Sequence, residues 1–173
     1  MFRSPWFRKT LLAALVFALG VATGGMLFHD VQPRRPFTSE NGLHFWDTPQ
    51  LTGLVGAVMI KNAPGLIPGY LFQTDRSVAM MYPIGPDRKR HFVVIPKRDI
   101  YDAGTLAAGD EPYLVDAFAV LGRLVREKKL VHYKIITNGS GEQLVSYLHF
   151  HLVSADAPET ILRPVRPEKA PAR

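Results

Sequence analysis

Cysteine is absent from this sequence, and its absence excludes several kinds of chemistry. Without a thiol the chain forms no disulfide, uses no cysteine nucleophile and offers no thiolate ligand to a metal. The sequence also lacks internal repeats and the interleaved aromatic and basic residues that are typical of a nucleic-acid module, so no nucleic-acid partner is expected. What is present is a 47% hydrophobic content, which predicts a folded domain, and a formal charge of +6, which suits a phosphate-bearing ligand or an anionic membrane.

Charge is missing from one long stretch near the N-terminus. Residues 10–28 carry no charged side chain, and as a helix they would rise about 28 Å, close to the hydrocarbon thickness of a bilayer. Residues 1–9 are basic, which favours a cytoplasmic N-terminus and a periplasmic or otherwise extracytoplasmic C-terminal domain. A cleaved signal peptide is the alternative, because small residues at 21–25 offer a cleavage site. The length of the apolar run favours an uncleaved, single-pass transmembrane anchor.

The remaining chain divides by composition into three parts. Residues 29–46 are polar, contain proline and show no periodicity, which predicts a linker. Residues 47–156 carry the helix and strand patterns and are expected to form one domain. The charged, proline-rich residues 157–173 are expected to be a flexible tail.

Two helices and five short strands are expected in the domain. The first helix begins near Asp47, with Pro49 in its first turn and an apolar face formed by Leu51, Leu54, Val55, Val58 and Met59. The second and longer helix, 110–129, begins at Asp110 and buries Leu114, Ala117, Leu121, Leu124 and Val125. The strands are expected at 70–75, 77–82, 91–96, 132–138 and 144–154. This order predicts an α+β fold with an antiparallel sheet.

Histidines alternate with apolar residues in the last strand, which reads SYLHFHLVS over 146–154. Because side chains alternate faces along a strand, Tyr147, His149 and His151 are expected on one face. Histidines on a half-exposed surface without a function are one interpretation, and a metal site using two histidine ligands is another. The third is nucleophilic catalysis at phosphorus, because neutral imidazole attacks without first losing a proton. That chemistry requires no metal and no cofactor.

Two stretches of the chain, taken together, resemble the histidine-triad (HIT) superfamily of nucleotide hydrolases and transferases. The first stretch contains Ile67-Pro68 and HFVVIPK at 91–97, and the second contains Asn138, Gln143 and YLHFHL at 147–152. The motifs occur in the family's order over about residues 50–154. The resemblance implies a HIT-like fold, and it allows a homodimer.

The resemblance also implies a role for each matching residue. His149 matches the family nucleophile, which forms a nucleotidyl-histidine intermediate, and His151 matches the histidine that contacts the phosphoryl group. His91, Asn138 and Gln143 match supporting or phosphate-side residues. Their alternative roles are local: the two amides would satisfy the turn, and His91 would be an ordinary residue at a strand end.

Three positions depart from the family pattern. Tyr147 replaces the first histidine of the triad, and at that position it is expected to be a supporting or phosphate-binding residue. A tyrosine donates one hydrogen bond but carries no positive charge. Asp99 stands where a histidine is common after Pro-Lys-x. Tyr82 and Pro83 stand where many members have an acid that binds ribose.

Two functions follow from these observations. The first is a membrane-anchored HIT-like hydrolase or transferase that acts on a phosphoester or phosphoanhydride. Its ligand would be a small nucleotide or a nucleotide-lipid, since the layout is similar to that of CDP-diacylglycerol pyrophosphatases. The alternative is a catalytically degraded module that binds a phosphorylated ligand or a protein partner at the membrane. The sequence indicates neither the base nor the leaving group.

Overall fold

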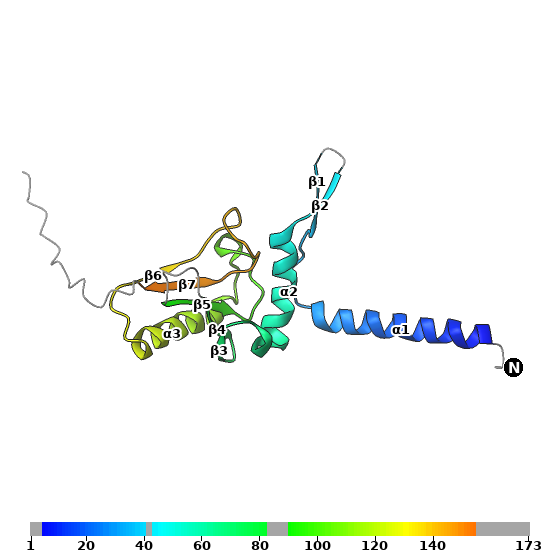
Figure 1. The fold of residues 1–173 in the computed structure, drawn as a ribbon, viewed down its shortest axis with the longest axis horizontal. Helices are drawn as coiled ribbons and strands as arrows, with labels where there is room; N and C mark the ends of the chain where they lie inside the picture. The colour runs from blue at the N-terminus through cyan, green and yellow to red at the C-terminus, as the bar shows by residue number, and fades with distance from the viewer. Residues whose placement is uncertain (1–4, 41–42, 83–89, 155–173) are drawn as a thin grey trace, which may run out of the picture.

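A computed structural model describes residues 5–40, 43–82 and 90–154 of the chain. An N-terminal helix, a small hairpin and an α+β domain follow one another along the molecule (Figure 1). The expected tail, 157–173, lies outside the described residues, as does Pro83.

Five antiparallel strands form the central sheet of the domain, in the order β3-β4-β5-β7-β6. Their bounds are β3 Tyr70–Gln73, β4 Ser77–Met81, β5 Arg90–Pro96, β6 Tyr133–Ile136 and β7 Phe150–Ser154. The last strand in the sequence, β7, is inserted between β5 and β6, so that His151 lies opposite Val93 on one side and Ile136 on the other. The predicted α+β fold with an antiparallel sheet is confirmed.

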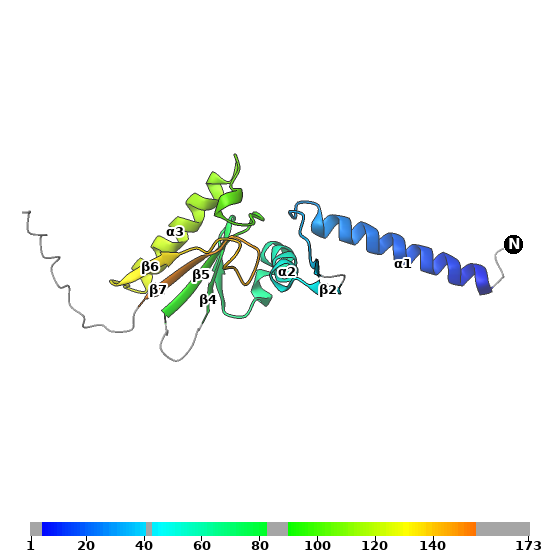
Figure 2. The same cartoon turned by 90° about the horizontal axis from the view of Figure 1, so that it is seen from above.

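Two helices cover different parts of this sheet. The long helix α3, Glu111–Glu127, lies on one face, and α2, Thr48–Asn62, crosses the end of the sheet nearest to the N-terminal helix (Figure 2). The predicted stripe of α3 packs against the apolar face of the strands, with Ala117, Leu121 and Leu124 fully buried. Short 3-10 helices, η1 Pro64–Leu66 and η2 Ala103–Thr105, precede β3 and α3.

The expected strand at 144–154 forms only over its second half, where β7 begins at Phe150. Residues 144–149 leave the ladder because their backbone groups bond elsewhere: the Ser146 amide donates to the Pro49 carbonyl, and the Leu148 amide donates to the Ile100 carbonyl. Alternation of side chains therefore cannot be extended back to Tyr147. The prediction that Tyr147 shares a face with the histidines rested on that extension.

The expected linker at 29–46 is also more structured than its composition indicated. It contains a two-stranded hairpin, β1 Phe37–Glu40 and β2 Leu43–Trp46. The residues before the hairpin pack on the domain, where Val31 contacts the cluster formed by Ala57, Ile60, Val78 and Tyr147. Polar composition alone gave no sign of these tertiary contacts.

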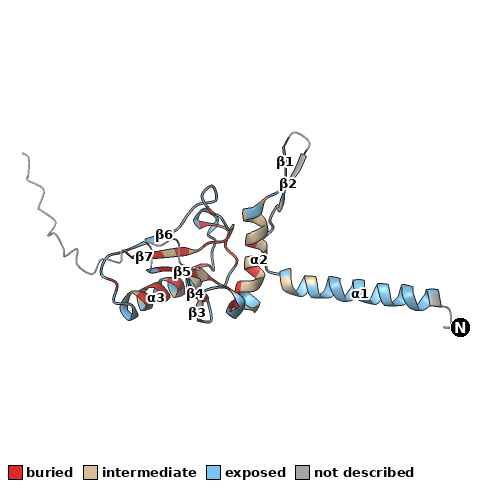
Figure 3. Cartoon of the chain, viewed as in Figure 1, coloured by how far each residue is buried: buried red, intermediate tan, exposed pale blue. Residues whose placement is uncertain are grey.

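The N-terminal helix α1, Pro5–Phe28, begins five residues before the uncharged stretch and extends away from the domain. The most apolar 18-residue window within Trp6–Phe28 has a mean hydropathy of 2.2, and none of it is buried against the protein. The helix is exposed along nearly its whole length (Figure 3). By length and composition α1 is able to cross a membrane.

The buried positions of α2 are not those of the predicted apolar face. Asp47 caps the helix by accepting a hydrogen bond from the Gln50 amide, as expected. The buried positions are Gly53, Ala57 and Ile60, whereas Val55 from the predicted face is 50% exposed. The small side chains allow α2 to approach the chain just before the histidines.

The two glycines inside α2 should respond to alanine in opposite directions. A Cβ at Gly53 would lie 2.5 Å from the Ser146 carbonyl oxygen, whereas a Cβ at Gly56 would meet its nearest neighbours at 3.9 Å. We expect Gly53→Ala to lower the free energy of unfolding by about 1–3 kcal/mol through overpacking. Gly56→Ala should raise it by about 0.5–1 kcal/mol, because alanine has the higher helix propensity. Urea denaturation of both variants measures the difference, and equal effects would contradict the close approach.

Candidate active site

His149 lies one residue before β7, half-buried, with its ring held by the main chain. Its Nδ1 is 2.6 Å from the carbonyl oxygen of Tyr147. A carbonyl only accepts hydrogen bonds, so Nδ1 carries the proton and donates. The neutral ring must then have its lone pair on Nε2, which makes Nε2 the nucleophilic atom.

His151 and His91 form a second pair beside His149. The rings of His149 and His151 meet edge to face, with centroids 4.7 Å apart. His151 Nδ1 lies 2.8 Å from Nε2 of His91, which is buried on β5. The ring of Tyr82 meets that of His91 edge-on at 6.0 Å. The structure therefore brings together the three histidines that the sequence singled out.

The surroundings of His149 and His151 disfavour a positive charge. Burial lowers the pKa of His149 below 6.5, and the hydrogen bond to the Tyr147 carbonyl raises it by a smaller amount. Burial, followed by the proximity of His149 and His91, lowers the pKa of His151 to about 4. Both imidazoles are therefore neutral near pH 7, as a nitrogen nucleophile needs to be.

Tyr147 does not share the exposed face of the histidines. Its side chain is 1% exposed and packs with Ala57, Ile60 and Val78, while its hydroxyl donates to the Pro96 carbonyl at 2.9 Å. Burial and the nearby Asp99 charge raise the pKa of Tyr147 well above 10, so the phenol keeps its proton and remains a donor. The contact of residue 147 with His149 is made by the backbone carbonyl, which every residue type supplies.

Asn138 and Gln143 lie in the turn between β6 and β7 and hydrogen-bond within it. Gln143 is buried, and its Nε2 donates to the Asn138 carbonyl at 2.9 Å. Asn138 Nδ2 in turn donates to the Glu142 carbonyl at 3.4 Å. These contacts match the local role that the sequence left open for both amides, and a phosphate-side role for them remains a prediction.

Two residues near the histidines were missed at the sequence level. Thr137 donates its hydroxyl to the His149 carbonyl at 2.9 Å. Arg34, in the segment expected to be a linker, donates to the Ser146 carbonyl from Nη2 at 2.7 Å and from Nε at 3.1 Å. No local sequence pattern indicates either residue, because their hydrogen-bond partners lie in other segments of the chain: Ser146 for Arg34 and His149 for Thr137.

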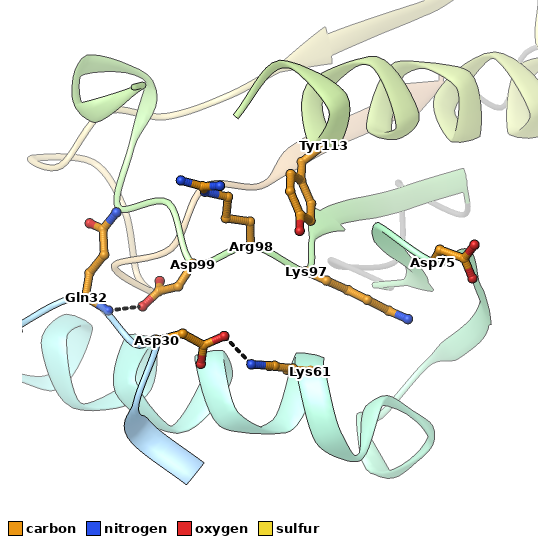
Figure 4. Close-up of a pocket in the computed structure, with 8 residues that line it drawn as sticks. All are labelled: Asp30, Gln32, Lys61, Asp75, Lys97, Arg98, Asp99 and Tyr113. Carbon is orange, nitrogen blue, oxygen red and sulfur yellow. Dashed lines mark hydrogen bonds and ion pairs between the residues drawn. The ribbon is translucent and has the colours of Figure 1, made fainter. Parts of the chain in front are cut away.

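A separate pocket of about 610 Å³ lies between the start of the expected linker, α2, the end of β5 and the start of α3 (Figure 4). Its lining residues are Asp30, Gln32, Lys61, Asp75, Lys97, Arg98, Asp99 and Tyr113, and none of the three histidines is among them. Several of its charged residues form ion pairs: Asp30 pairs with Lys61 across the pocket, and Arg98 pairs with Asp110, which lies outside the lining. Within the described residues, no group of three or more His, Asp or Glu side chains is arranged to hold a metal ion.

The strand order and the histidine cluster define a HIT-type α+β domain, and solved structures have the same fold. A HIT family hydrolase from Clostridium thermocellum matches with a TM-score of 0.51 and 25% identity, over 62% of this chain and 96% of that one. A HIT family hydrolase from Legionella pneumophila is also 25% identical, with a TM-score of 0.48, over 60% of this chain and 94% of that one. No curated protein sequence matches the chain.

The sequence family described as "Scavenger mRNA decapping enzyme C-term binding" (DcpS_C) matches residues 66–163, more than half of the chain. The chain therefore belongs to this family, and through it to the HIT superfamily.

Removing the Tyr147 hydroxyl should affect stability without changing the protonation of His149. We expect Tyr147→Phe to lower the free energy of unfolding by about 1 kcal/mol, because the Pro96 carbonyl loses a buried donor. Nitrogen NMR of labelled histidine should still find His149 protonated on Nδ1, since its acceptor is main chain. Tyr147→His should be less stable than Tyr147→Phe and no more active than wild type. A gain in turnover on restoring histidine would contradict this account.

Proposed function

We propose that the chain is a HIT-type hydrolase or transferase that acts on a phosphoanhydride or phosphoester of a nucleotide, with His149 as its nucleophile. The observation that carries the proposal is the hydrogen bond from His149 Nδ1 to the Tyr147 carbonyl, which directs the lone pair to Nε2. Membership of a family described by an mRNA decapping enzyme supports a nucleotide substrate. The similarity to a HIT family hydrolase supports hydrolysis.

The reaction proceeds in two steps. Nε2 of His149 forms a bond to phosphorus as the bond to the leaving oxygen breaks, and the leaving group departs with the electron pair. Water then attacks the same phosphorus as the bond from phosphorus to Nε2 breaks. The lone pair returns to Nε2, the proton of the water passes to solvent, and the nucleotide is released. His151 assists as a neutral donor when its Nδ1 accepts from His91, because its Nε2 then carries the proton.

The neutral histidines favour one kind of leaving group. With a pKa of about 4, His151 is neutral near pH 7, so it is not the imidazolium that could transfer an acidic proton to a departing alkoxide or amine. A phosphate released from an anhydride leaves as a stable anion and needs no such proton. The site is therefore better suited to an anhydride, such as a nucleotide pyrophosphate linkage, than to a phosphoramidate.

A nucleotide-lipid is the substrate class that best combines this chemistry with α1. Arg34 lies six positions after the end of α1 at Phe28, so the two Cα atoms are at most about 22 Å apart. Arg34 contacts Ser146, three residues before His149. If α1 crosses the bilayer, the nucleophile is held near the membrane surface, where the headgroup of a nucleotide-lipid is presented.

His149 should be required for turnover. The full-length protein in detergent is incubated with CDP-diacylglycerol in mixed micelles, with soluble dinucleotides and with nucleoside phosphoramidates. We expect nucleotide release from an anhydride substrate, complete loss of release in His149→Ala, and an acid-labile nucleotidyl adduct on His149 in the wild type. The value of kcat/KM should fall on acidification through a pKa below 6.5, because protonation of Nε2 removes its lone pair.

Two results would redirect the proposal. Turnover that persists in His149→Ala would exclude the nucleophile assigned here. Measurable binding of the same ligands with no turnover of any of them would favour the alternative, a module that binds a phosphorylated ligand or a partner at the membrane.

We further propose that α1 is an uncleaved anchor with the domain on the extracytoplasmic side. Its exposed apolar surface supports this arrangement, as do the basic residues Arg3, Arg8 and Lys9. Alkaline phosphatase fused after Arg173 should be active, and the membrane-bound protein should retain the mass of the intact chain. Replacing the three basic residues with glutamine should lower the fraction of molecules that have the domain on the extracytoplasmic side. A product that lacks residues 10–28 would instead identify a cleaved signal peptide.

A further inference from the structure

The backbone that holds His149 belongs to a segment that makes no strand-ladder hydrogen bonds. Residues 145–148, called here the approach segment, precede β7 and lie outside its ladder. The carbonyl of Tyr147 in this segment accepts the hydrogen bond from His149 Nδ1. Any rotation of the approach segment would move that acceptor and release the ring nitrogen.

Arg34 binds the peptide group next to that acceptor. Two guanidinium nitrogens converge on the Ser146 carbonyl, at 2.7 Å from Nη2 and 3.1 Å from Nε. A second edge of the guanidinium, formed by Nη1 and Nη2, donates to both carboxylate oxygens of Asp99, at 2.6 Å from Nη1 and 2.5 Å from Nη2. The Arg34 side chain is 0% exposed and that of Asp99 is 5% exposed, so the network is shielded from water.

The arm that carries Arg34, residues 29–36, is fastened to the domain at several points. Asp30 pairs with Lys61 of α2, and the Gln32 amide donates to Asp99 at 2.8 Å (Figure 4). The Pro36 carbonyl accepts from the Asp47 amide at 2.8 Å. These contacts make Arg34 part of the domain, although it lies before the expected boundary at residue 47.

The helix α2 leaves room for this network where it crosses Arg34. A Cβ at Gly53 would lie 2.8 Å from Arg34 Nε and 2.5 Å from the Ser146 carbonyl oxygen. The absence of a side chain at residue 53 is therefore a steric condition for the contact between Arg34 and Ser146.

We propose that Arg34 is a positioning residue for His149: its guanidinium fixes the Ser146 carbonyl and thereby the adjoining peptide, whose Tyr147 carbonyl keeps the His149 proton on Nδ1. The membrane-side arm thus completes the active site without touching the substrate. This inference rests on the proposed function, because it takes Nε2 of His149 as the reacting atom.

The test separates positioning from simple stabilisation. Arg34→Met alone would leave the buried Asp99 carboxylate without its arginine partner. The informative variant is therefore the double substitution Arg34→Met/Asp99→Leu, which removes both charges and keeps apolar volume. Arg34→Lys keeps a charge beside Asp99 but lacks the planar fork that reaches two acceptors at once. Arg35→Met is the matched control, because Arg35 is the exposed neighbour.

Full-length protein labelled with ¹⁵N-histidine is compared in detergent, with thermal unfolding measured in parallel. We expect wild type and Arg35→Met to hold His149 as the single Nδ1-protonated tautomer. The double variant should unfold near the wild-type temperature yet show both tautomers, and its kcat should fall about 10²-fold with little change in KM. Arg34→Lys should also show mixed tautomers, and it decides the question if the double variant does not fold.

A folded double variant, or Arg34→Lys, with the wild-type tautomer and unchanged kcat would overturn the inference. The tautomer measurement needs no substrate, so it distinguishes the two proposals. Turnover that survives His149→Ala while the tautomer shifts in the Arg34 variants would reject the nucleophile and leave the positioning contact standing. Turnover that is lost in His149→Ala, with an unchanged tautomer and kcat in the Arg34 variants, would support the nucleophile and reject the positioning contact.

Discussion

A buried arginine fork joins three parts of this chain that are far apart in sequence: the arm after α1, the loop after β5 and the segment before β7. Burying two charges is unfavourable unless each polar atom finds a partner, and removing one member of such a pair typically costs about 3–5 kcal/mol. Here Arg34 satisfies both oxygens of Asp99 and still reaches the Ser146 carbonyl. The geometry of His149 follows from this network, because the next carbonyl along the chain, that of Tyr147, accepts its Nδ1 proton.

The network also relates two departures from the histidine-triad pattern. Asp99 and Tyr147 each stand where a histidine is expected from the resemblance, and both contact Arg34: Asp99 through its carboxylate, and Tyr147 through its ring, whose centroid lies 5.9 Å from the guanidinium carbon. Viewed singly, the tyrosine suggests a damaged catalytic site. Viewed in the fold, it is a core residue with a satisfied hydroxyl, and His149, His151 and His91 remain together beside it. The tyrosine is therefore no sign of a catalytically degraded module.

Neutral imidazoles are the second constraint on function. Burial disfavours protonation of both His149 and His151, and the proximity of His149 and His91 adds to this effect at His151. The cluster therefore offers a lone pair and neutral N–H donors at neutral pH. Such a site is suited to attack on phosphorus with departure of a stable anion. The position of the arm, between an apolar helix and the segment before His149, connects this chemistry to a membrane surface in the proposed function.

Local pattern was sufficient for much of this protein. Hydrophobic periodicity predicted α3 and its buried stripe, and short strand-like runs predicted the strands. The motif around His149 and His151 predicted the fold that the family match supports. Tertiary structure alone decided that the Tyr147 side chain points into the core, that β7 begins at Phe150 and that Arg34 binds the Ser146 carbonyl. The physical reason is distance along the chain: Arg34 and Ser146 are separated by 112 residues, and their hydrogen bond leaves no signature in the periodicity near either one. The proposed nucleophile, His149, is thus marked by a local motif, whereas the contact proposed to orient it exists only once the chain has folded.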